Sequence, residues 1–267
     1  MRVAALTDIH GNLPALDAVL REVRQAGVDA IVVGGDVLPG PMPRETLARL
    51  LQLEIPTHFV YGNGELAVLA QMTAGDPDEV TYWGTSGGAV LPERFREVIR
   101  WTARQLPEYQ QLLASWPLTT SLDIEGLGTV LFCHATPRNE VEIFTRLTSE
   151  ERLRPVFEGV NAAVVVCGHT HMQFDRVVGK TRVVNAGSVG MPFGSTGAHW
   201  LLLGPHLELR QTHYDLAAAA ERIRLTAYPL VEEMAVQYVL QPPSEDESLA
   251  AYSRAELTQV RARSHGK

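Results

Sequence analysis

Seven side chains that can bind a metal ion stand at the ends of apolar segments in this sequence. They are Asp8, His10, Asp36, Asn63, His134, His169 and His171. Imidazole nitrogens with carboxylate and amide oxygens, and no thiolate, suit Mn, Fe, Zn, Ni or Co better than Ca or an iron–sulfur cluster. The set exceeds what one tetrahedral ion needs. It therefore predicts two divalent transition-metal ions, with one carboxylate shared between them.

The spacing within this set also favours metal binding. On extended backbone, residues i and i+2 point to the same face, so Asp8 with His10, and His169 with His171, can each share one ion. Taken alone, each residue has an ordinary structural interpretation, because a carboxylate after a strand often caps a helix or forms a turn. Those interpretations do not predict the same event at the end of strand after strand. The set as a whole therefore predicts a metal site.

The segments that carry these residues alternate between strand and helix patterns. Apolar runs at 1–8, 29–36 and 57–63 predict buried strands, and 13–27 and 44–54 have helical spacing. This alternation predicts parallel strands with right-handed crossovers. Ligands of such sheets collect outside the carboxyl ends of the strands. We therefore expect the seven side chains to converge at one edge.

The remainder of the chain is expected to add an insert, a second group of strands and a tail. Residues at about 65–117 are mostly helical in pattern, and 120–214 are rich in strand patterns. We expect one domain over residues 1–240. The polar segment 241–267 is expected to be an appendage or partly disordered.

The order of the motifs resembles that of the calcineurin-like metallophosphoesterases. The family pattern Asp-x-His, Gly-Asp, Gly-Asn-His-Asp/Glu, His and Gly-His-x-His is met by "DIH", "GGD", "GNGE", "CHATP" and "GHTH". Phrases such as "DIHGNLPALDAVL" and "VNAGSVGMP" are similar to the YfcE-like prokaryotic phosphodiesterase branch. The resemblance implies a four-layer α/β/β/α sandwich, in which two mixed β-sheets are flanked by helices.

The resemblance also implies roles for individual residues. One metal would be held by Asp8, His10, Asp36 and His171, and the other by Asp36, Asn63, His134 and His169. Mn is the expected metal, with Fe, Zn, Ni or Co as alternatives. Paired ions roughly 3.5–4 Å apart lower the pKa of a bridging water and neutralise phosphate oxygens. The implied reaction is in-line attack of a bridging hydroxide on a phosphodiester, with Asp36, Asn63 and His134 as catalytic residues.

Substrate contacts are expected from Asn12, Gly64 and Ser188, the last within "NAGSVGMP", whose N–H groups could lie near a phosphate. At Gly64 the chain departs from the family pattern, which has a histidine that contacts the phosphate and helps protonate the leaving oxygen. Such help is typically worth ~10²–10⁴-fold. We therefore expect substrates with acidic leaving groups, an acid from elsewhere, or a slow enzyme. His58 and His199 are the candidate substitutes, and glycine is expected to enlarge the pocket, which favours a diester.

Composition limits the partners. With 23 basic and 31 acidic residues, the net charge of −8 argues against a broad nucleic-acid surface. No apolar span reaches membrane length and the N-terminus does not resemble a signal peptide. Cys133 and Cys167 lie in apolar runs, which predicts buried free thiols and a cytoplasmic protein. The expected partner is a small organic phosphate or nucleotide-like phosphodiester, and self-association as a homo-oligomer is left open.

Two other functions fit the same motifs. A phosphomonoesterase or protein phosphatase could use the same site, although alkoxide leaving groups need a general acid more. A non-catalytic protein-binding scaffold could use the fold alone, although all seven ligand residues are present.

Overall fold

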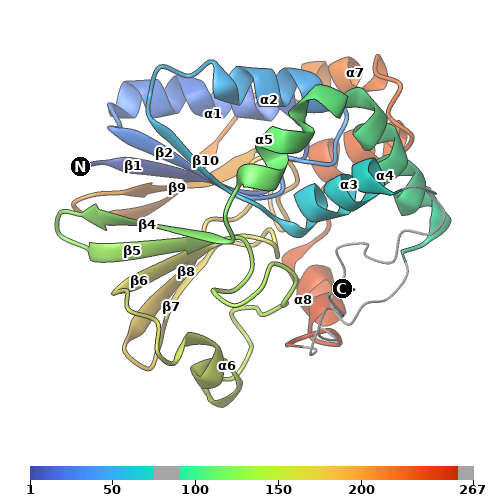
Figure 1. Cartoon of the computed structure of the whole chain (residues 1–267). Coiled ribbons are helices and arrows are strands. Elements are labelled where there is room, and N and C mark those ends of the chain that lie inside the picture. Colours follow the sequence, from blue (N-terminus) through green and yellow to red (C-terminus); the bar gives the residue numbers. More distant parts are fainter. Residues whose placement is uncertain (75–90, 258–267) are drawn as a thin grey trace.

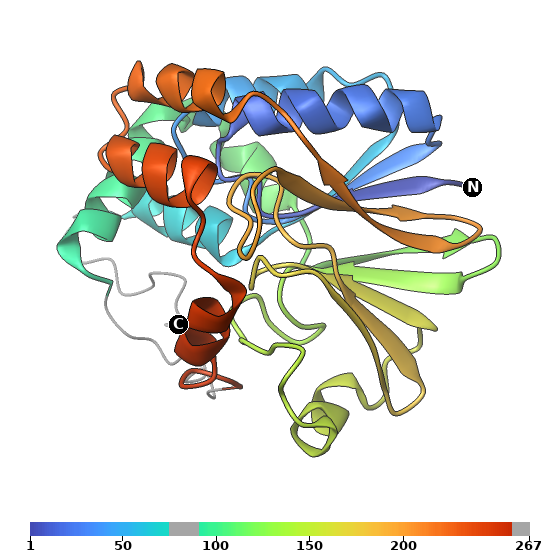
Figure 2. The same cartoon turned by 180° about the vertical axis from the view of Figure 1, so that it is seen from behind.

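Two five-stranded sheets stacked face to face form the centre of this computed structural model, which describes residues 1–74 and 91–257 (Figures 1 and 2). The first sheet has the strand order β10-β9-β1-β2-β3. Its strands are β1 (Val3–Leu6), β2 (Ala30–Gly34), β3 (Thr57–Val60), β9 (Ala198–Leu203) and β10 (Leu207–Thr212). β1, β2 and β3 are parallel, as predicted, and β9 and β10 pair antiparallel. The first sheet is therefore mixed.

The second sheet is also mixed and has the order β4-β5-β6-β8-β7. Its strands are β4 (Thr119–Ile124), β5 (Gly128–Cys133), β6 (Val164–Cys167), β7 (Phe174–Val178) and β8 (Thr181–Asn185). β5, β6 and β8 are parallel, whereas β4 and β7 pair antiparallel at the two edges.

Helices cover the outer faces of both sheets and complete the predicted four layers (Figure 1). α1 (Leu13–Ala26), α2 (Pro43–Leu51) and α7 (Leu216–Arg224) cover the first sheet, and α6 (Glu150–Phe157) covers the second. The α/β/β/α fold class is confirmed. No helix within the described ranges has the length and apolar character needed to cross a bilayer.

Alternating side chains on the strands fill the spaces between these layers. In β1, Ala4 and Leu6 pack beneath the helices, whereas Val3 and Ala5 pack between the two sheets. A strand buried on both faces needs a continuous apolar sequence, which is why this segment has no polar positions. A third core joins the second sheet to α6 through Leu153.

α1 illustrates how the sequence sets the bounds of an element. The Asn12 side chain accepts a hydrogen bond from the Ala15 N–H at the start of the helix. Gly27 ends it with φ 61°, a left-handed conformation that glycine adopts without steric cost. These caps fix where the helix begins and ends.

The predicted insert contains the helices α3 (Asn63–Thr73), α4 (Glu93–Gln105), η3 (Pro107–Tyr109) and α5 (Gln110–Ser115). Residues 75–90 of the insert lie outside the described part of the chain. α3 packs against α4 at one end of the molecule.

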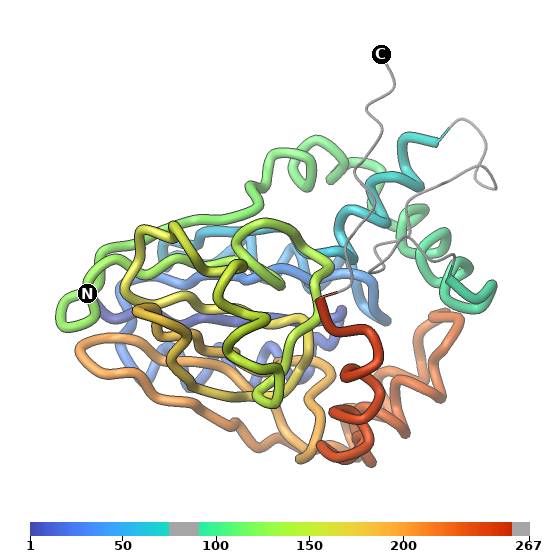
Figure 3. Tube along the Cα trace, turned by 90° about the horizontal axis from the view of Figure 1, so that it is seen from below, coloured from blue at the N-terminus to red at the C-terminus, as the bar shows by residue number. Residues whose placement is uncertain are grey.

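Part of the segment expected as a polar tail is helical and packed. A π-helix, η4 (Glu233–Leu240), precedes α8 (Glu245–Tyr252), which begins with a reciprocal Ser244 and Glu247 capping box. Leu249 is buried, and Glu256 pairs with Arg152 at 2.7 Å. Figure 3 shows these C-terminal helices at the same end of the molecule as α3 and α4.

Candidate metal centre

The predicted ligands converge at the carboxyl ends of the strands as two neighbouring groups. The first group is Asp8, His10 and His171, and the second is Asp36, His134 and His169. Asp36 lies between them, because its Oδ2 is 3.7 Å from His10 Nε2 and its Oδ1 is 3.6 Å from His134 Nε2. The carboxylate of Asp36 can therefore contact an ion in either group.

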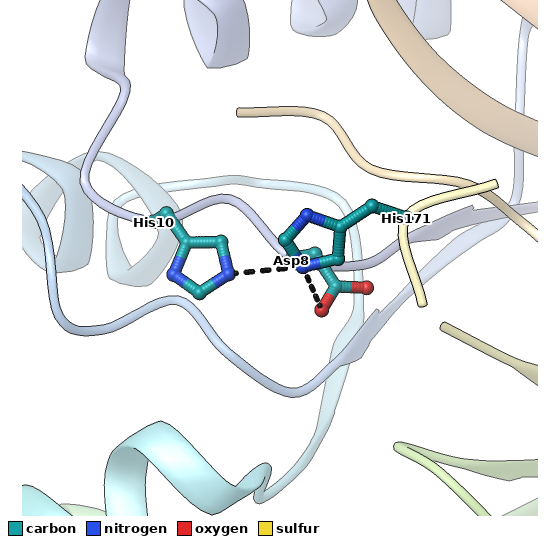
Figure 4. A group of neighbouring side chains, drawn as sticks. All are labelled: Asp8, His10 and His171. Atoms are coloured by element: carbon teal, nitrogen blue, oxygen red, sulfur yellow. Dashed lines mark hydrogen bonds and ion pairs between the residues drawn. The ribbon is translucent and has the colours of Figure 1, made fainter. Parts of the chain in front are cut away.

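The first group directs unshared electron pairs at one point (Figure 4). His171 Nε2 is 3.3 Å from His10 Nε2 and 3.2 Å from Asp8 Oδ1. The other ring nitrogens, the Nδ1 atoms, lie 3.2 Å and 2.7 Å from the carbonyl oxygens of Pro39 and Met191. Since a carbonyl oxygen only accepts, each Nδ1 carries a hydrogen, and in the neutral ring each Nε2 then presents a lone pair. Facing lone pairs repel one another unless a cation lies between them.

The ionisation of this first group fits that interpretation. Burial and the nearby His171 lower the pKa of His10 to about 3, so its ring is neutral at pH 7. The Oδ1 atom of Asp8 is buried, and its close neighbour, His171 Nε2 at 3.2 Å, has no hydrogen to donate when the ring is neutral with its hydrogen on Nδ1. An unpaired buried carboxylate oxygen is costly. A bound cation would remove that cost.

The second group has the same pattern. His134 donates from Nδ1 to the carbonyl oxygen of Gly34 at 3.1 Å, which leaves Nε2 with a lone pair. That Nε2 faces Asn63 Oδ1 at 3.0 Å and His169 Nδ1 at 3.1 Å. Burial, together with His134, lowers the pKa of His169 to about 3. The donor atoms of this group therefore also suit a divalent ion.

The pKa values of the two aspartates are shifted in opposite directions. Burial raises the pKa of Asp8, but His171 and other nearby imidazoles outweigh it and hold that pKa below its usual range. Burial and the charge of Asp8 raise the pKa of Asp36 well above its usual range. Two carboxylates buried this close are compatible with full ionisation only if positive charge is added.

Backbone strain is concentrated on the same residues. Five of them have left-handed φ angles: Asp8 (54°), His10 (46°), Asp36 (50°), His169 (67°) and His171 (59°). Among the described residues, Leu257 is the one other non-glycine residue with positive φ. The left-handed region costs such residues about 1–2 kcal/mol each. The expectation that the two pairs converge on extended backbone is wrong, because both lie beyond the strand ends and turn in this strained conformation.

Interactions between loops hold that conformation in place. The N–H of Asp8 donates to Gly35 O at 3.0 Å, and the N–H of His10 donates to Asp36 O at 3.0 Å. These bonds join the loop after β1 to the loop after β2. The ligands of the two groups are thereby positioned relative to each other.

Glu65 organises the second group from behind. Its carboxylate is fully buried and accepts hydrogen bonds from the backbone N–H groups of Asp36 (2.9 Å), Gly62 (2.7 Å) and Leu38 (3.0 Å). Burial and the charge of Asp36 raise its pKa to about 7. The motif predicted an acidic residue at this position, where it was expected to orient a histidine. That its carboxylate accepts hydrogen bonds from backbone N–H groups instead was not predicted.

Gly64 does not open space in the way expected. Its N–H donates to Asp36 Oδ1 at 2.7 Å, and a Cβ added to it would lie 2.0 Å from the carbonyl oxygen of Leu38. The backbone of Leu38 therefore occupies the volume next to this α-carbon. The predicted enlargement of the pocket is wrong at that point, although Gly64 does border a cavity.

Asn12 and Ser188, the other predicted substrate contacts, are fully buried and bonded inside the protein. Asn12 caps α1 and donates from Nδ2 to Gly190 O at 2.9 Å. The Ser188 hydroxyl donates to Asp8 O at 2.7 Å and accepts from the Met191 N–H at 2.8 Å. Both side chains position the loops that carry the ligands.

A cavity of about 270 Å³ adjoins the two groups of ligands. His10, Asp36 and Asn63 line one side. Much of the remaining wall comes from α4 and from the segment that includes η4, namely Phe95, Val98, Ile99, Tyr228, Leu230, Glu233, Met234 and Tyr238. The C-terminal part of this wall was missed at the sequence level, where "YPLVEEMAVQYVL" indicated a helix and nothing about a site.

Neither histidine considered as a substitute acid lines this cavity. His58 is exposed on β3. His199 is buried on β9, where its Nε2 lies 3.0 Å from Ser195 Oγ. Burial, with the nearby His213, lowers the pKa of His199 to about 4, so it is neutral at pH 7. His199 is therefore a poor proton donor near neutrality.

We expect His199→Gln to change acid stability but not catalysis. The folded pKa of about 4 lies below the usual 6.5, so the unfolded chain takes up a proton first as the pH falls. The stability associated with neutral His199 is therefore present above pH 6.5 and is lost toward pH 4. Between pH 6.5 and pH 4, the free energy of unfolding measured in urea should fall less steeply for the variant than for the wild type, by up to about 1.4 kcal/mol per pH unit. A large fall in kcat at pH 7.5 would instead place His199 in the reaction.

Comparison with known proteins is consistent with this geometry. The family model described as the calcineurin-like phosphoesterase superfamily domain matches residues 1–204. An uncharacterized protein of Methanocaldococcus jannaschii is 27% identical over 242 residues, which cover 83% of this chain and 91% of that protein.

Two solved structures share the fold. A hypothetical protein of Pyrococcus horikoshii has a TM-score of 0.73 at 19% identity, covering 91% of this chain and 99% of that one. A metallophosphoesterase of Sphaerobacter thermophilus has a TM-score of 0.64 at 24% identity, covering 88% and 98%. At these identities the likeness establishes the fold.

Proposed function

This chain belongs to the calcineurin-like phosphoesterase superfamily, and we propose that it is a metal-dependent phosphodiesterase that binds two divalent ions. The observation that carries the proposal is the pair of ligand groups joined by Asp36. Their lone pairs face one another at 3.0–3.3 Å. Such an arrangement is stable when cations occupy it.

Each ligand residue has a place in this proposal. One ion would be held by Asp8, His10, Asp36 and His171, and the other by Asp36, Asn63, His134 and His169. The mixed nitrogen and oxygen donors support Mn and are also compatible with Fe, Zn, Ni or Co. Two ions at such a site supply an activated water and the positive charge that phosphoryl transfer needs.

The chain's own groups position the reaction but offer little acid catalysis. Glu65 holds Asp36, and the carbonyl oxygens of Gly34, Pro39 and Met191 fix the imidazole rings. Among the described residues that line the cavity, the phenols of Tyr228 and Tyr238 have their pKa values raised by burial, which makes them poor proton donors, and Glu233 pairs with Arg94.

This shortage of acids favours substrates whose leaving oxygen departs without a proton. The apolar wall gives room for a second substituent on phosphorus. Both features support a phosphodiester with an acidic leaving group rather than an alkyl monoester.

A direct comparison of esters tests the proposal. With Mn²⁺, bis(4-nitrophenyl) phosphate should be hydrolysed at least about tenfold faster in kcat/KM than 4-nitrophenyl phosphate. His134→Ala should lower the diester rate by on the order of 10²–10³-fold. Faster turnover of the monoester would favour the phosphomonoesterase. Absence of turnover with Mn²⁺, Ni²⁺, Co²⁺ and Zn²⁺, together with no thermal stabilisation by these ions, would favour the scaffold.

We also propose that the protein is cytoplasmic. Cys133 and Cys167 are both free and buried, as the sequence predicted. Free thiols are typical of reducing compartments.

A further inference from the structure

We propose that the cavity beside the ligand groups binds an uncharged, apolar organic group of the substrate, such as a short alkyl chain or an aryl ring. This inference rests on the proposed phosphodiesterase function and names the class of ester that it uses. It follows from the position, the lining and the charge of the cavity.

The cavity has one polar end and one apolar wall. His10, Asp36 and Asn63 form the polar end, where a phosphoryl group would meet the ions. The apolar wall includes Phe95 on α4 and Leu230 before η4. A phosphorus atom at the polar end therefore directs one of its substituents toward hydrophobic side chains. Burial of apolar surface there is the favourable term that binding can use.

The size of the cavity limits that substituent. Pockets of about 300–1,000 Å³ hold drug-sized ligands, and this one has about 270 Å³. A phosphoryl group with a substituent the size of a phenyl ring or a hexyl chain is consistent with this volume. A longer chain would extend beyond the cavity and gain no further burial there.

The charge of the cavity argues against polyphosphates and other substrates that carry a second anionic group. Within the described ranges, no lysine or arginine lines it. Arg94 on α4 instead pairs with Glu233 at 3.0 Å, and its guanidinium lies 4.5 Å from the centre of the Phe95 ring. A second anionic group placed against the apolar wall would be buried without a counter-charge. Along that wall, the hydroxyls of a sugar would meet the phenols of Tyr228 and Tyr238 and the carboxylate of Glu233, which already pairs with Arg94, in a lining that is otherwise mostly apolar.

The wall is formed by two segments that are distant in the sequence, α4 and the segment that includes η4. The Arg94–Glu233 ion pair links α4 to η4. The Trp101 ring meets the Tyr228 ring edge to face at 5.6 Å. These contacts hold α4 against the C-terminal segment, so the apolar surface of the cavity has a defined shape that can select a substituent.

Three diesters with one leaving group test the inference. Methyl, hexyl and 5′-thymidyl esters of 4-nitrophenyl phosphate differ in the retained substituent alone. Each buried CH₂ group is worth about a fourfold gain. With about three of them buried, kcat/KM of the hexyl ester should exceed that of the methyl ester by roughly 50-fold. The thymidyl ester should gain nothing over the methyl ester.

A pair of leucine variants identifies the wall. Leu230→Ser, which lies on the cavity, should lower the hexyl-to-methyl ratio by about tenfold. Leu225→Ser, at a side chain that is 88% exposed and does not line the cavity, should leave the ratio unchanged. An equal fall in both variants would contradict the assignment of the ratio to this wall.

Failure of this inference differs from failure of the proposed function. Metal-dependent turnover with equal kcat/KM for the methyl and hexyl esters, or with the thymidyl ester preferred, overturns the apolar substituent alone. If no ester is hydrolysed, calorimetric titration of the Mn²⁺-loaded protein with hexylphosphonate and methylphosphonate still measures the preference. Tighter binding of hexylphosphonate supports the inference, and equal binding overturns it.

Discussion

Asp36→Asn should abolish the metal-dependent activity of this protein, with kcat/KM for a 4-nitrophenyl diester falling by on the order of 10³-fold or more. The reason is its position. Its two carboxylate oxygens lie 3.6 Å and 3.7 Å from His134 Nε2 and His10 Nε2. Asparagine offers one oxygen and no charge, so it cannot serve both groups or neutralise the ions as the carboxylate does. The rise in Tm that Mn²⁺ produces in the wild type should disappear as well.

The same substitution should not lower the stability of the metal-free protein. The asparagine side chain would keep an oxygen for the Gly64 N–H, which now donates to Asp36 Oδ1 at 2.7 Å. The substitution would also remove a buried carboxylate whose pKa is raised by burial and by the charge of Asp8. In EDTA at pH 8, the Tm of the variant should therefore be equal to that of the wild type or higher.

These opposite effects separate loss of metal from misfolding. Asp17→Asn is the matched control, because Asp17 lies on α1 and pairs with Arg49 at 2.8 Å. It should alter neither the metal response nor the rate. If Asp36→Asn kept both the rise in Tm with Mn²⁺ and the rate of diester hydrolysis, Asp36 would not be the shared ligand.

The local sequence predicted the part of the fold that carries the ligands. Apolar runs and helical spacing located β1, α1, β2, α2 and β3, because burial on both faces leaves little choice of residue in such strands. Parallel strands then place Asp8 and Asp36 at the same edge. The convergence of the ligands follows from topology more than from any one motif.

The backbone at the ligands could not be predicted in the same way. Left-handed φ angles at Asp8 and His10 are uncommon for residues other than glycine, although Asp and His adopt them more often than most. They persist because bonds from distant segments fix them, such as Gly190 N–H to Asp8 O at 2.9 Å. Such contacts join residues that are far apart in the sequence, so the pattern of neighbouring residues does not predict them. The position of η4 beside the cavity could not be predicted for the same reason.

Gly64→His, which restores the residue of the family pattern, should lower the activity of this protein rather than raise it. The new Cβ would lie 2.0 Å from Leu38 O and 3.0 Å from Asp36 Oδ1. Leu38 cannot move freely, because its N–H donates to the buried Glu65 at 3.0 Å. We expect the free energy of unfolding to fall by about 2–4 kcal/mol and kcat/KM to fall at least tenfold. Urea unfolding and diester hydrolysis with Mn²⁺ measure the two effects.

Gly64→Ala separates backbone crowding from imidazole chemistry. Alanine carries the same Cβ, so it should produce most of the loss of stability and most of the loss of rate. Leu69→His, at a half-buried position on α3, controls for a histidine placed in this helix and should keep the rate. A gain of tenfold or more with Gly64→His, beside a loss with Gly64→Ala, would show that the Leu38 loop yields and that the imidazole protonates the leaving group. Loss in both variants means that the loop after β2 is built around glycine, so the leaving oxygen must depart without help from residue 64.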